Sequence, residues 1–577
     1  MQLLTSLTVK GNIKHPKLLL EDNEYWGTVT HGEEIRINAV ADSRVLINGQ
    51  DTAEFTPAVG LNVYLLTVEG KQGEFRLNII CRLPEQEAFA QSLRPQLHMS
   101  PELFSLNDPN GLVYDEHTGE YHLFFQCDYP GPGYKVQGDT KAWGHAVSKD
   151  LISWEELPVA IPSDETGAIW SGSAVIDKDN LSGLFDSSVP PQSRFLFYYT
   201  YFRGKKGLGC SVGLAYSVDH CRTLINYGTI IENENNLYSA GFRDPNITWV
   251  PDPELAGGGK WVMVACGDTA ALVFWSNDLI HWEYASEVLD KNGNRLITEC
   301  PNIFPMEHEG KTVWVLMAAG TWYVLGDFIF ENGIPYYKPY TDLIYPCNGV
   351  KELWGPGSSP LFPENYASQT FYNASGNRRI QMSWIRDFWY DPANKPWWNF
   401  LSLPVELRLE DSADGARIGY YPIDEWNGLI KEELLSFNGE ISQGDGTACL
   451  MGDIKDELLL IRARLKGAGK FGFSVLGGGV RVYYDAKSKR MITDKSGSRG
   501  DYSSFKYDGP VLVEKEYADI TVIVDRCSVE AYINGTYQSG MAYAEGGISF
   551  ISDCVASGSI KIYSLNKIQR NALESFY

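Results

Sequence analysis

The sequence of 577 residues lacks any long hydrophobic run. No stretch of about 18 apolar residues occurs in it, so a membrane-spanning helix is not expected. The first twenty residues, MQLLTSLTVKGNIKHPKLLL, also lack the sustained apolar segment and the small-residue cleavage site of a secretory signal. We therefore expect a cytoplasmic protein, or a secreted one if a leader has been removed from it.

Metal-ligand patterns and basic runs are also absent. The ten cysteines are scattered without C-x-x-C pairs, which favours free buried thiols over disulfides or a zinc site. Asp and Glu number 73 against 49 Lys and Arg, which gives a net charge of −24. Such a surface repels phosphate backbones and anionic lipids, so neither nucleic acid nor a membrane is an expected partner. A neutral small molecule or oligosaccharide fits this charge better.

Aromatic residues, by contrast, are abundant: they make up 13% of the chain, with 16 Trp and 33 Tyr. This content suits an all-β protein, or one that stacks flat apolar rings against sugars. Filling of sheet cores accounts for most of these rings equally well. The chain is also too long for one ordinary core, so more than one domain is expected.

A repeat in the middle of the chain predicts the architecture. SKDLISWEELP at 148–158 is echoed by SNDLIHWEYAS at 276–286, and a degenerate copy, SVDHCRTL, begins at Ser217. Each copy closes a unit that opens with a short polar motif and continues into an apolar strand. The opening motifs are NDPNG (107–111), WSGSA (170–174), FRDPN (242–246), ECPN (299–302) and ENYASQTF (364–371).

Five such units predict a five-bladed β-propeller over residues 100–410, the alternative being a β-sandwich with an accidental echo. The first strand of every propeller blade lines the central axis, so the opening motifs are expected to converge on one pocket. Alternating strands predict an additional β-sandwich-like domain at 1–95 and a C-terminal β-sandwich at 425–577. The segment GYYPIDEWNGLI (419–430) has the composition of a linker between the last two domains.

Three opening motifs carry an acid: Asp108, Asp244 and Glu299. Clustered carboxylates destabilise one another, so their convergence needs a chemical reason. A metal site is one, but these motifs contain no His and lack the alternating spacing of a calcium loop. Glycoside cleavage explains them better, because it needs one carboxylate to attack or to activate water and one carboxylic acid to protonate the leaving oxygen. That chemistry needs no metal and no cofactor.

At these motifs the sequence resembles glycoside hydrolase family 32, which contains invertases, inulinases and levanases. LNDPNGLVYD is similar to the family's sucrose-box motif, and WSGSA, FRDPN, ECPN and FLSLPVEL follow in the family's order. The resemblance implies a β-fructofuranosidase with Asp108 as nucleophile, Glu299 as general acid and base, and Asp244 as the residue that stabilises the transition state. It also implies a fructose-binding set: Asn107, Gln126, Trp143, Trp170, Ser171 and Arg243. A Trp within 384–389 is a further candidate.

The chain departs from the family pattern at four positions. Ser105 replaces an aromatic residue, Asn246 stands where many members have Lys, Asn302 replaces the Asp of an ECPD motif, and Glu364 replaces an Asp. We expect these changes to tune the acid and the subsite beyond fructose. The N-terminal domain is unusual for the family, and we expect it to shape that subsite or to mediate self-association into a homo-oligomer.

Three alternatives stay open at this point. A fructosyltransferase would use the same double displacement with a sugar hydroxyl in place of water. An inverting propeller glycosidase of the arabinanase type would hold its carboxyls farther apart. A non-catalytic fructan-binding protein would have no need of all three acids. Linkage preference and exo or endo action are not determined by the sequence.

Overall fold

The structure is a computed structural model. It describes residues 3–19, 23–84, 87–91, 93–128, 141–164, 167–203, 209–345, 364–387, 396–442, 451, 453–499, 506–571 and 573. Its regular elements in these ranges are β-strands and short 3₁₀ helices, which confirms the all-β prediction. Within the same ranges no helix is both long and apolar enough to cross a membrane.

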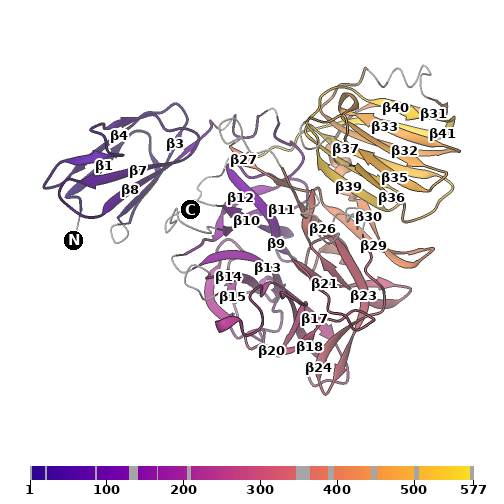
Figure 1. Ribbon diagram of the computed structural model, residues 1–577, viewed down its shortest axis with the longest axis horizontal. Coiled ribbons are helices and arrows are strands. Elements are labelled where there is room, and N and C mark those ends of the chain that lie inside the picture. The colour runs from indigo at the N-terminus through magenta and orange to yellow at the C-terminus, as the bar shows by residue number, and fades with distance from the viewer. Residues whose placement is uncertain are drawn as a thin grey trace.

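The N-terminal part of the chain forms two facing sheets, seen at the indigo end of the ribbon in Figure 1. The three-stranded sheet has the order β1-β4-β6 and the five-stranded sheet the order β2-β3-β8-β7-β5. Their strands are β1 Ser6–Lys10, β2 Lys14–Leu19, β3 Glu24–Thr30, β4 Ile35–Val40, β5 Val45–Ile47, β6 Glu54–Phe55, β7 Gly60–Val68 and β8 Glu74–Arg82. A hydrophobic core of their own fills the space between them, with Ile35, Leu66 and Leu77 fully buried.

In the described part of the chain five sheets follow one another, each built on four antiparallel strands. Their strands are β9 Phe104–Asp115, β10 Glu120–Asp128, β11 Lys141–Ser148 and β12 Glu155–Ile161; β13 Ala168–Ile176, β14 Phe195–Phe202, β15 Cys210–Ser217 and β16 Ile225–Ile231; β17 Arg243–Pro251, β18 Gly259–Cys266, β19 Leu272–Ser276 and β20 Glu283–Glu287; β21 Pro301–His308, β22 Lys311–Ala318, β23 Trp322–Glu331 and β24 Ile334–Pro339; β25 Asn365–Thr370, β26 Arg379–Ile385, β29 Val405–Ser412 and β30 Gly415–Pro422. Short strands β27 (Trp397–Trp398) and β28 (Phe400–Leu401) pair with β9 and β26, so the last part of the ring is joined to the first sheet.

The first strands of the five sheets contact one another in order, and β25 contacts β9 in turn, so the sheets close into a propeller. Second strands such as β14 (FLFYYTYF) are covered on both faces and read as continuous apolar runs. Fourth strands such as β20 (EYASE) are partly exposed. The opening motifs lie at or just before the first strands, which brings them to the axis.

The sequence echo marks the turn after the third strand of a blade. In the first blade Asp150 accepts hydrogen bonds from the backbone N–H groups of Ile152 and Ser153. In the third blade Asp278 accepts the corresponding bonds from Ile280 and His281. The repeat is therefore a capped turn that recurs between the last two strands of a blade.

The C-terminal part forms a second two-sheet sandwich, shown in orange and yellow in Figure 1. Its sheets have the orders β31-β41-β32-β37-β38-β39 and β36-β35-β34-β33-β40. The strands are β31 Ile430–Ile441, β32 Leu458–Gly467, β33 Lys470–Val475, β34 Val480–Asp485, β35 Arg490–Asp494, β36 Lys506–Pro510, β37 Ala518–Asp525, β38 Ser528–Ile533, β39 Thr536–Met541, β40 Ser549–Ser552 and β41 Ala556–Leu565. The 3₁₀ helices are η2 Pro191–Ser193, η4 Glu234–Asn236, η6 Ser375–Asn377, η7 Asp424–Leu429 and η8 Leu476–Gly478.

The expected linker is an ordered part of the fold. Residues 419–422 belong to β30, the last strand of the fifth blade, and η7 follows directly. Trp426 in η7 is buried in the core that the propeller shares with the sandwich. The linker interpretation was therefore wrong, because the Tyr-rich start of the segment completes a sheet and its Trp fills a core.

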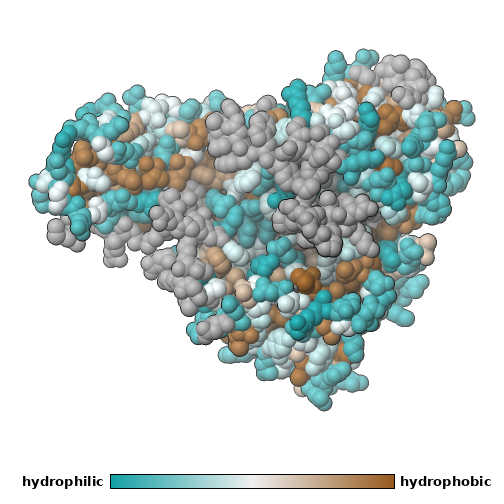
Figure 2. All heavy atoms as spheres, in the orientation of Figure 1, coloured by the Kyte–Doolittle hydropathy of each residue, from teal (hydrophilic) through white to brown (hydrophobic). Residues whose placement is uncertain are grey.

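The face of the molecule drawn in Figure 2 is largely hydrophilic, with a brown apolar band over the N-terminal sheets. Leu18 in β2 and Val40 in β4 are among the exposed large hydrophobic residues of the protein. Self-association through the N-terminal domain stays a prediction.

Candidate active site

A cavity of about 340 Å³ lies where the first strands of the blades begin. Residues from all five opening motifs line it, as the propeller prediction requires. The lining residues are Asp108, Gln126, Lys141, Trp170, Ser171, Arg243, Asp244, Glu299, Cys300, Tyr366, Trp384 and Arg386. All three predicted carboxylates are therefore at one site.

Asp108 lies in β9, and its carboxylate is oriented by the neighbouring blade. Ser171 on β13 donates a hydrogen bond from its hydroxyl to Oδ2 of Asp108 at 2.6 Å. The thiol of Cys300 lies 3.6 Å from the same oxygen. Burial raises the pKa of Asp108, the Ser171 hydrogen bond opposes this, and the charge of Glu299 adds to it. One oxygen of Asp108 is thus fixed by donors from two other blades.

Asp244 is the most enclosed of the three acids, with 6% of its side chain exposed. Its Oδ2 accepts the backbone N–H of Cys300 at 3.1 Å and lies 3.4 Å from Nε of Arg243. Burial raises the pKa of Asp244 to about 7; Arg243 opposes the shift, and the charges of Glu299 and Asp108 add to it. Desolvation and like charge therefore outweigh the guanidinium.

Glu299 precedes β21 and is more accessible, with 39% of its side chain exposed. Its Oε1 accepts a hydrogen bond from Nη2 of Arg243 at 2.9 Å. Its Oε2 accepts a hydrogen bond from the hydroxyl of Tyr366 on β25. Arg243 therefore links Asp244 and Glu299, and each carboxyl has a different set of partners.

Left-handed backbone positions occur where the site residues enter the sheets. Asp244, Cys300 and Ala367 have φ values of 57°, 43° and 52°. The β17 and β25 pairings also shift register here, between Arg243 and Asn246 and between Tyr366 and Gln369. These bulges at the start of the inner strands turn side chains toward the cavity at a cost in backbone strain.

Two residues of the predicted fructose-binding set do not line the cavity. Asn107 accepts a hydrogen bond at 2.8 Å from Lys141, which does line it. Trp143 is fully buried between blades and donates from Nε1 to the backbone oxygen of Trp170 at 2.9 Å. Trp170 lines the cavity and stacks on Phe202, with ring centroids 4.1 Å apart. Trp143 thus supports the wall from behind, because its indole is large enough to fill the space between two blades.

Sequence reasoning did not select four of the lining residues: Lys141, Cys300, Tyr366 and Arg386. Cys300 and Tyr366 lie inside opening motifs, and that position is the signal by which they could have been found. Arg386 stacks on Trp384, with its guanidinium carbon 4.9 Å from the ring centroid. Trp384 lies in the predicted window, whereas Trp389 lies outside the described residues.

The four departures from the family pattern lie away from the cavity. Ser105 donates to Asp128, whose other partner is Lys141, at 2.7 Å in each case. Asn246 and Asn302 lie farther along the axis, in a second pocket. Glu364 is buried and pairs with Lys495 of the C-terminal sandwich at 2.6 Å. Ser105 is connected to the cavity wall through Asp128 and Lys141, and the backbone oxygen of Glu364 accepts the N–H of the lining residue Arg386 at 2.7 Å.

Among the described residues, one group of three side chains on the surface could hold a metal ion. His308, Glu309 and Asp411 have ligand atoms within 4.8 Å of one another. His308 already lies 3.2 Å from Asp411 in an ion pair, and Glu309 and Asp411 are exposed. This group is separate from the cavity.

A closed propeller whose axial cavity holds three differently bonded carboxylates and an arginine has the fold and site of a glycoside hydrolase. Residues 98–422 match the Glycosyl hydrolases family 32 N-terminal domain, and residues 438–566 match the family's C-terminal domain. The chain belongs to glycosyl hydrolases family 32.

Relatives of this chain agree with that assignment. It is 30% identical to a levanase of Bacillus subtilis over 83% of this chain and 70% of the relative. It is 32% identical to a levanase of Bacillus sp. strain L7, of which it spans 52%. The crystal structure of an exo-inulinase from Aspergillus awamori superposes with a TM-score of 0.66 at 24% identity and covers 83% of this chain and all of that one. The last match shows the shared fold.

Proposed function

We propose that the protein is a retaining β-fructofuranosidase that releases terminal β-D-fructofuranosyl residues from sucrose, fructo-oligosaccharides or fructans such as inulin and levan. The observation that carries the proposal is the convergence of Asp108, Asp244 and Glu299 on one cavity, each with different partners. Relatives named levanase and exo-inulinase support a fructosyl substrate.

In the first step Asp108 attacks the anomeric carbon of the fructosyl unit. The Ser171 hydroxyl holds one carboxylate oxygen in place at 2.6 Å and favours its ionised form. Glu299 protonates the departing sugar oxygen.

In the second step water attacks the fructosyl-enzyme, and Glu299 acts as the base that activates it. Glu299 suits this role because it is the more accessible carboxyl and is held by Arg243 and Tyr366. Asp244 and Arg243 bind fructose hydroxyls, and the carboxylate of Asp244 stabilises the positive charge that develops on the ring. Trp170 and Trp384 provide apolar walls for the sugar.

Product analysis with sucrose, inulin and levan tests the proposal. We expect free fructose from at least one substrate, and about 10³-fold or greater loss of kcat in Asp108→Ala and in Glu299→Ala. Asp342→Ala is the matched control, since Asp342 is an exposed acid that pairs with Lys291 on the surface. Near-normal turnover by either catalytic variant would contradict the assigned roles.

The stereochemistry of the first product tests the double displacement. Proton NMR at early times should show β-fructofuranose before it mutarotates, because two inversions give net retention. Initial release of the α-anomer would indicate an inverting enzyme. Oligosaccharides formed from sucrose, with glucose exceeding fructose, would indicate transfer to a sugar.

A further inference from the structure

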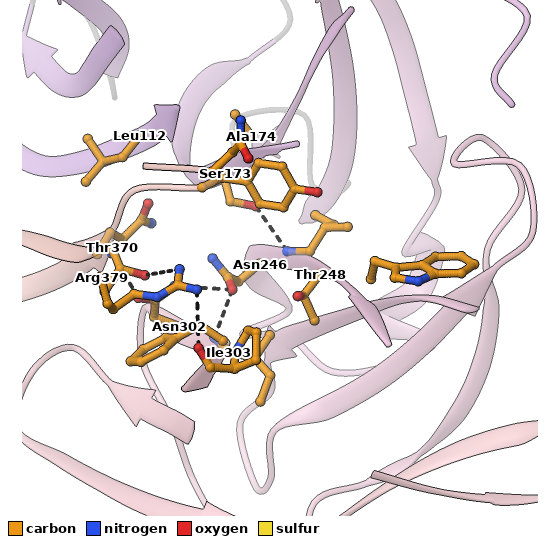
Figure 3. Close-up of a pocket in the computed structure, with 16 residues that line it drawn as sticks. Leu112, Ser173, Ala174, Asn246, Thr248, Asn302, Ile303, Thr370 and Arg379 are labelled. Carbon is orange, nitrogen blue, oxygen red and sulfur yellow. Dashed lines mark hydrogen bonds between the residues drawn. The ribbon is translucent and has the colours of Figure 1, made fainter. Parts of the chain in front are cut away.

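A second cavity lies farther along the propeller axis, beyond the active-site residues of each inner strand. This axial pocket has a volume of about 180 Å³, room for about six water molecules at about 30 Å³ each. All five inner strands contribute to it, through Leu112, Ser173, Asn246, Asn302 and Thr370 (Figure 3). None of these residues lines the active-site cavity.

Arg379 is the one Lys, Arg, Asp or Glu among the described residues that line the axial pocket. Its hydrogen bonds go to neutral oxygens at the long end of the normal range: Thr370 Oγ1 at 3.4 Å, Phe371 O at 3.2 Å and Pro305 O at 3.3 Å. Among the residues that the structure describes, no carboxylate lies within ion-pair distance of it. Its positive charge is therefore not neutralised by a carboxylate of the described ranges.

An acid that contacts the pocket wall, Glu116, has a cationic partner of its own. Glu116 accepts a hydrogen bond from the lining residue Asn373 at 2.8 Å and lies 3.5 Å from Nζ of Lys178. Arg379 itself packs on Phe304, with its guanidinium carbon 5.0 Å from the ring centroid. Burial lowers the pKa of Arg379 to about 10, so it stays charged at neutral pH in surroundings that hydrate it poorly.

The two asparagines of the pocket turn their oxygens toward the protein. Oδ1 of Asn246 accepts the backbone N–H of Ile303 at 2.9 Å and the amide of Asn302 at 3.4 Å. Oδ1 of Asn302 accepts the backbone N–H of Thr370 at 2.9 Å. Because the side-chain oxygens accept these hydrogen bonds, the NH₂ group of Asn246 is available to donate hydrogen bonds to other partners. The pocket thus presents donors together with one positive charge.

These asparagines are two of the positions where the chain departs from the family pattern. Both are neutral amides in contact with each other, so neither supplies a counter-ion to Arg379 in the pocket that they share.

We propose that the axial pocket binds a small oxyanion, of the class of inorganic phosphate, sulfate or a simple carboxylate, through Arg379 and the amide and hydroxyl groups around it. The forked N–H groups of an arginine match the geometry of such oxyanions. The volume of about 180 Å³ is large enough for such an anion. The net charge of −24 opposes the approach of anions, so binding in the millimolar range is expected.

Titration calorimetry of the full chain with inorganic phosphate, at constant ionic strength and pH 7, tests the proposal. We expect one phosphate bound per chain. Affinity should fall roughly tenfold or more in Arg379→Gln, as expected for loss of a hydrogen-bonding charge. Arg417→Gln is the matched control, because Arg417 lies in β30 outside the pocket and donates to the backbone oxygen of Ala416. The phosphate affinity of Arg417→Gln should equal that of the unchanged protein.

Asn302→Asp keeps the guanidinium and the shape of the side chain but supplies an internal counter-ion, so it serves if Arg379→Gln fails to fold. We expect it to abolish phosphate binding while the protein stays folded, as circular dichroism and thermal unfolding would show. Absence of binding to the unchanged protein would overturn the proposal. Undiminished binding by Asn302→Asp, or by a folded Arg379→Gln, would also overturn it and assign the anion to another site.

Discussion

The three carboxyls of the cavity differ because their neighbours differ. Asp108 has a hydroxyl donor, Glu299 has a guanidinium and a phenol, and Asp244 is the most deeply enclosed. Repulsion among three like charges in one cavity lowers the free energy of unfolding. This destabilisation depends on pH, and a substitution at Asp244 can measure it.

Asp244→Asn is expected to stabilise the folded protein at pH 8. The pKa of Asp244 is raised from 3.8 to about 7, so the folded state holds a proton that the unfolded state releases. The ionised group therefore lowers the free energy of unfolding increasingly as pH rises from about 4 to about 7, and fully above that. The gain in Asp244→Asn is at most about 4 kcal/mol, part of it offset by the lost Arg243 contact. Thermal unfolding at pH 8 and pH 4 measures it.

Asp278→Asn is the matched control with the opposite sign. Burial of Asp278 is outweighed by hydrogen bonds from His281 and Ile280, which lower its pKa. This carboxylate contributes stability above the pKa of the unfolded chain, and the variant should lose it at pH 8. A lower melting temperature for Asp244→Asn at pH 8 than for the unchanged protein would contradict our account of the cluster.

At the scale of elements, the inner strands position the site by close packing of backbone on backbone. Gly172 follows Ser171 in β13 and bonds to two other inner strands: its backbone oxygen accepts from Gln369 of β25 at 2.9 Å, and its N–H donates to Asn110 of β9 at 3.1 Å. A Cβ atom at this position would lie 1.9 Å from the backbone oxygen of Tyr198. Strand β13 therefore has no room for a side chain here.

Gly172→Ala is expected to destabilise the protein by about 2–4 kcal/mol, because the added methyl forces β13 away from β14. Trp170 and Ser171 move with the strand, so kcat should fall as well. Denaturant unfolding and steady-state kinetics measure the two effects. Gly428→Ala is the control: Gly428 is exposed in η7, and its added Cβ would meet nothing within 4 Å. Equal stability of the two variants would show that β13 can shift enough to accommodate the added methyl group.

Some elements could be predicted from the sequence better than others. The opening motifs and the echoed turns are local and periodic, so the propeller could be predicted from them. The segment 419–430 resembled a linker because its Pro, Gly and Asn are typical of loops. Its role depends on partners that the sequence does not place beside it: β29 pairs with β30, and the shared core receives Trp426.

At the scale of the whole molecule, buried polar contacts join the propeller to the C-terminal sandwich. Nδ1 of His98 lies 2.7 Å from Asp525, and Nε2 lies 3.2 Å from Glu530. Burial alone would lower the pKa of His98, but the hydrogen bonds to the two acids outweigh it and raise the pKa to about 9. Asp525 also accepts the backbone N–H groups of Gln96 and Leu97, so the start of the propeller is fixed to β37.

His98→Gln is expected to lower the free energy of unfolding by about 3 kcal/mol at pH 6 and by less at pH 10. A histidine whose folded pKa lies above that of the unfolded chain, about 6.5, stabilises fully below 6.5 and loses this contribution as pH rises through 9. Thermal unfolding across this range measures the difference. His281→Gln is the control, since His281 pairs with Asp278 at the same 2.7 Å but is 86% exposed. A pH-independent effect at His98 would contradict the charged contact.

The sequence by itself determined the all-β class, the family and the three carboxylates, because these depend on local motifs repeated at the same place in each blade. The tertiary structure alone decided which other residues surround them. Tyr366 reaches Glu299 from another blade, Trp143 supports Trp170 from behind, and Glu364 joins the sandwich through Lys495. Such contacts join residues that are distant in sequence, and only the closure of the ring and the docking of the sandwich bring them together.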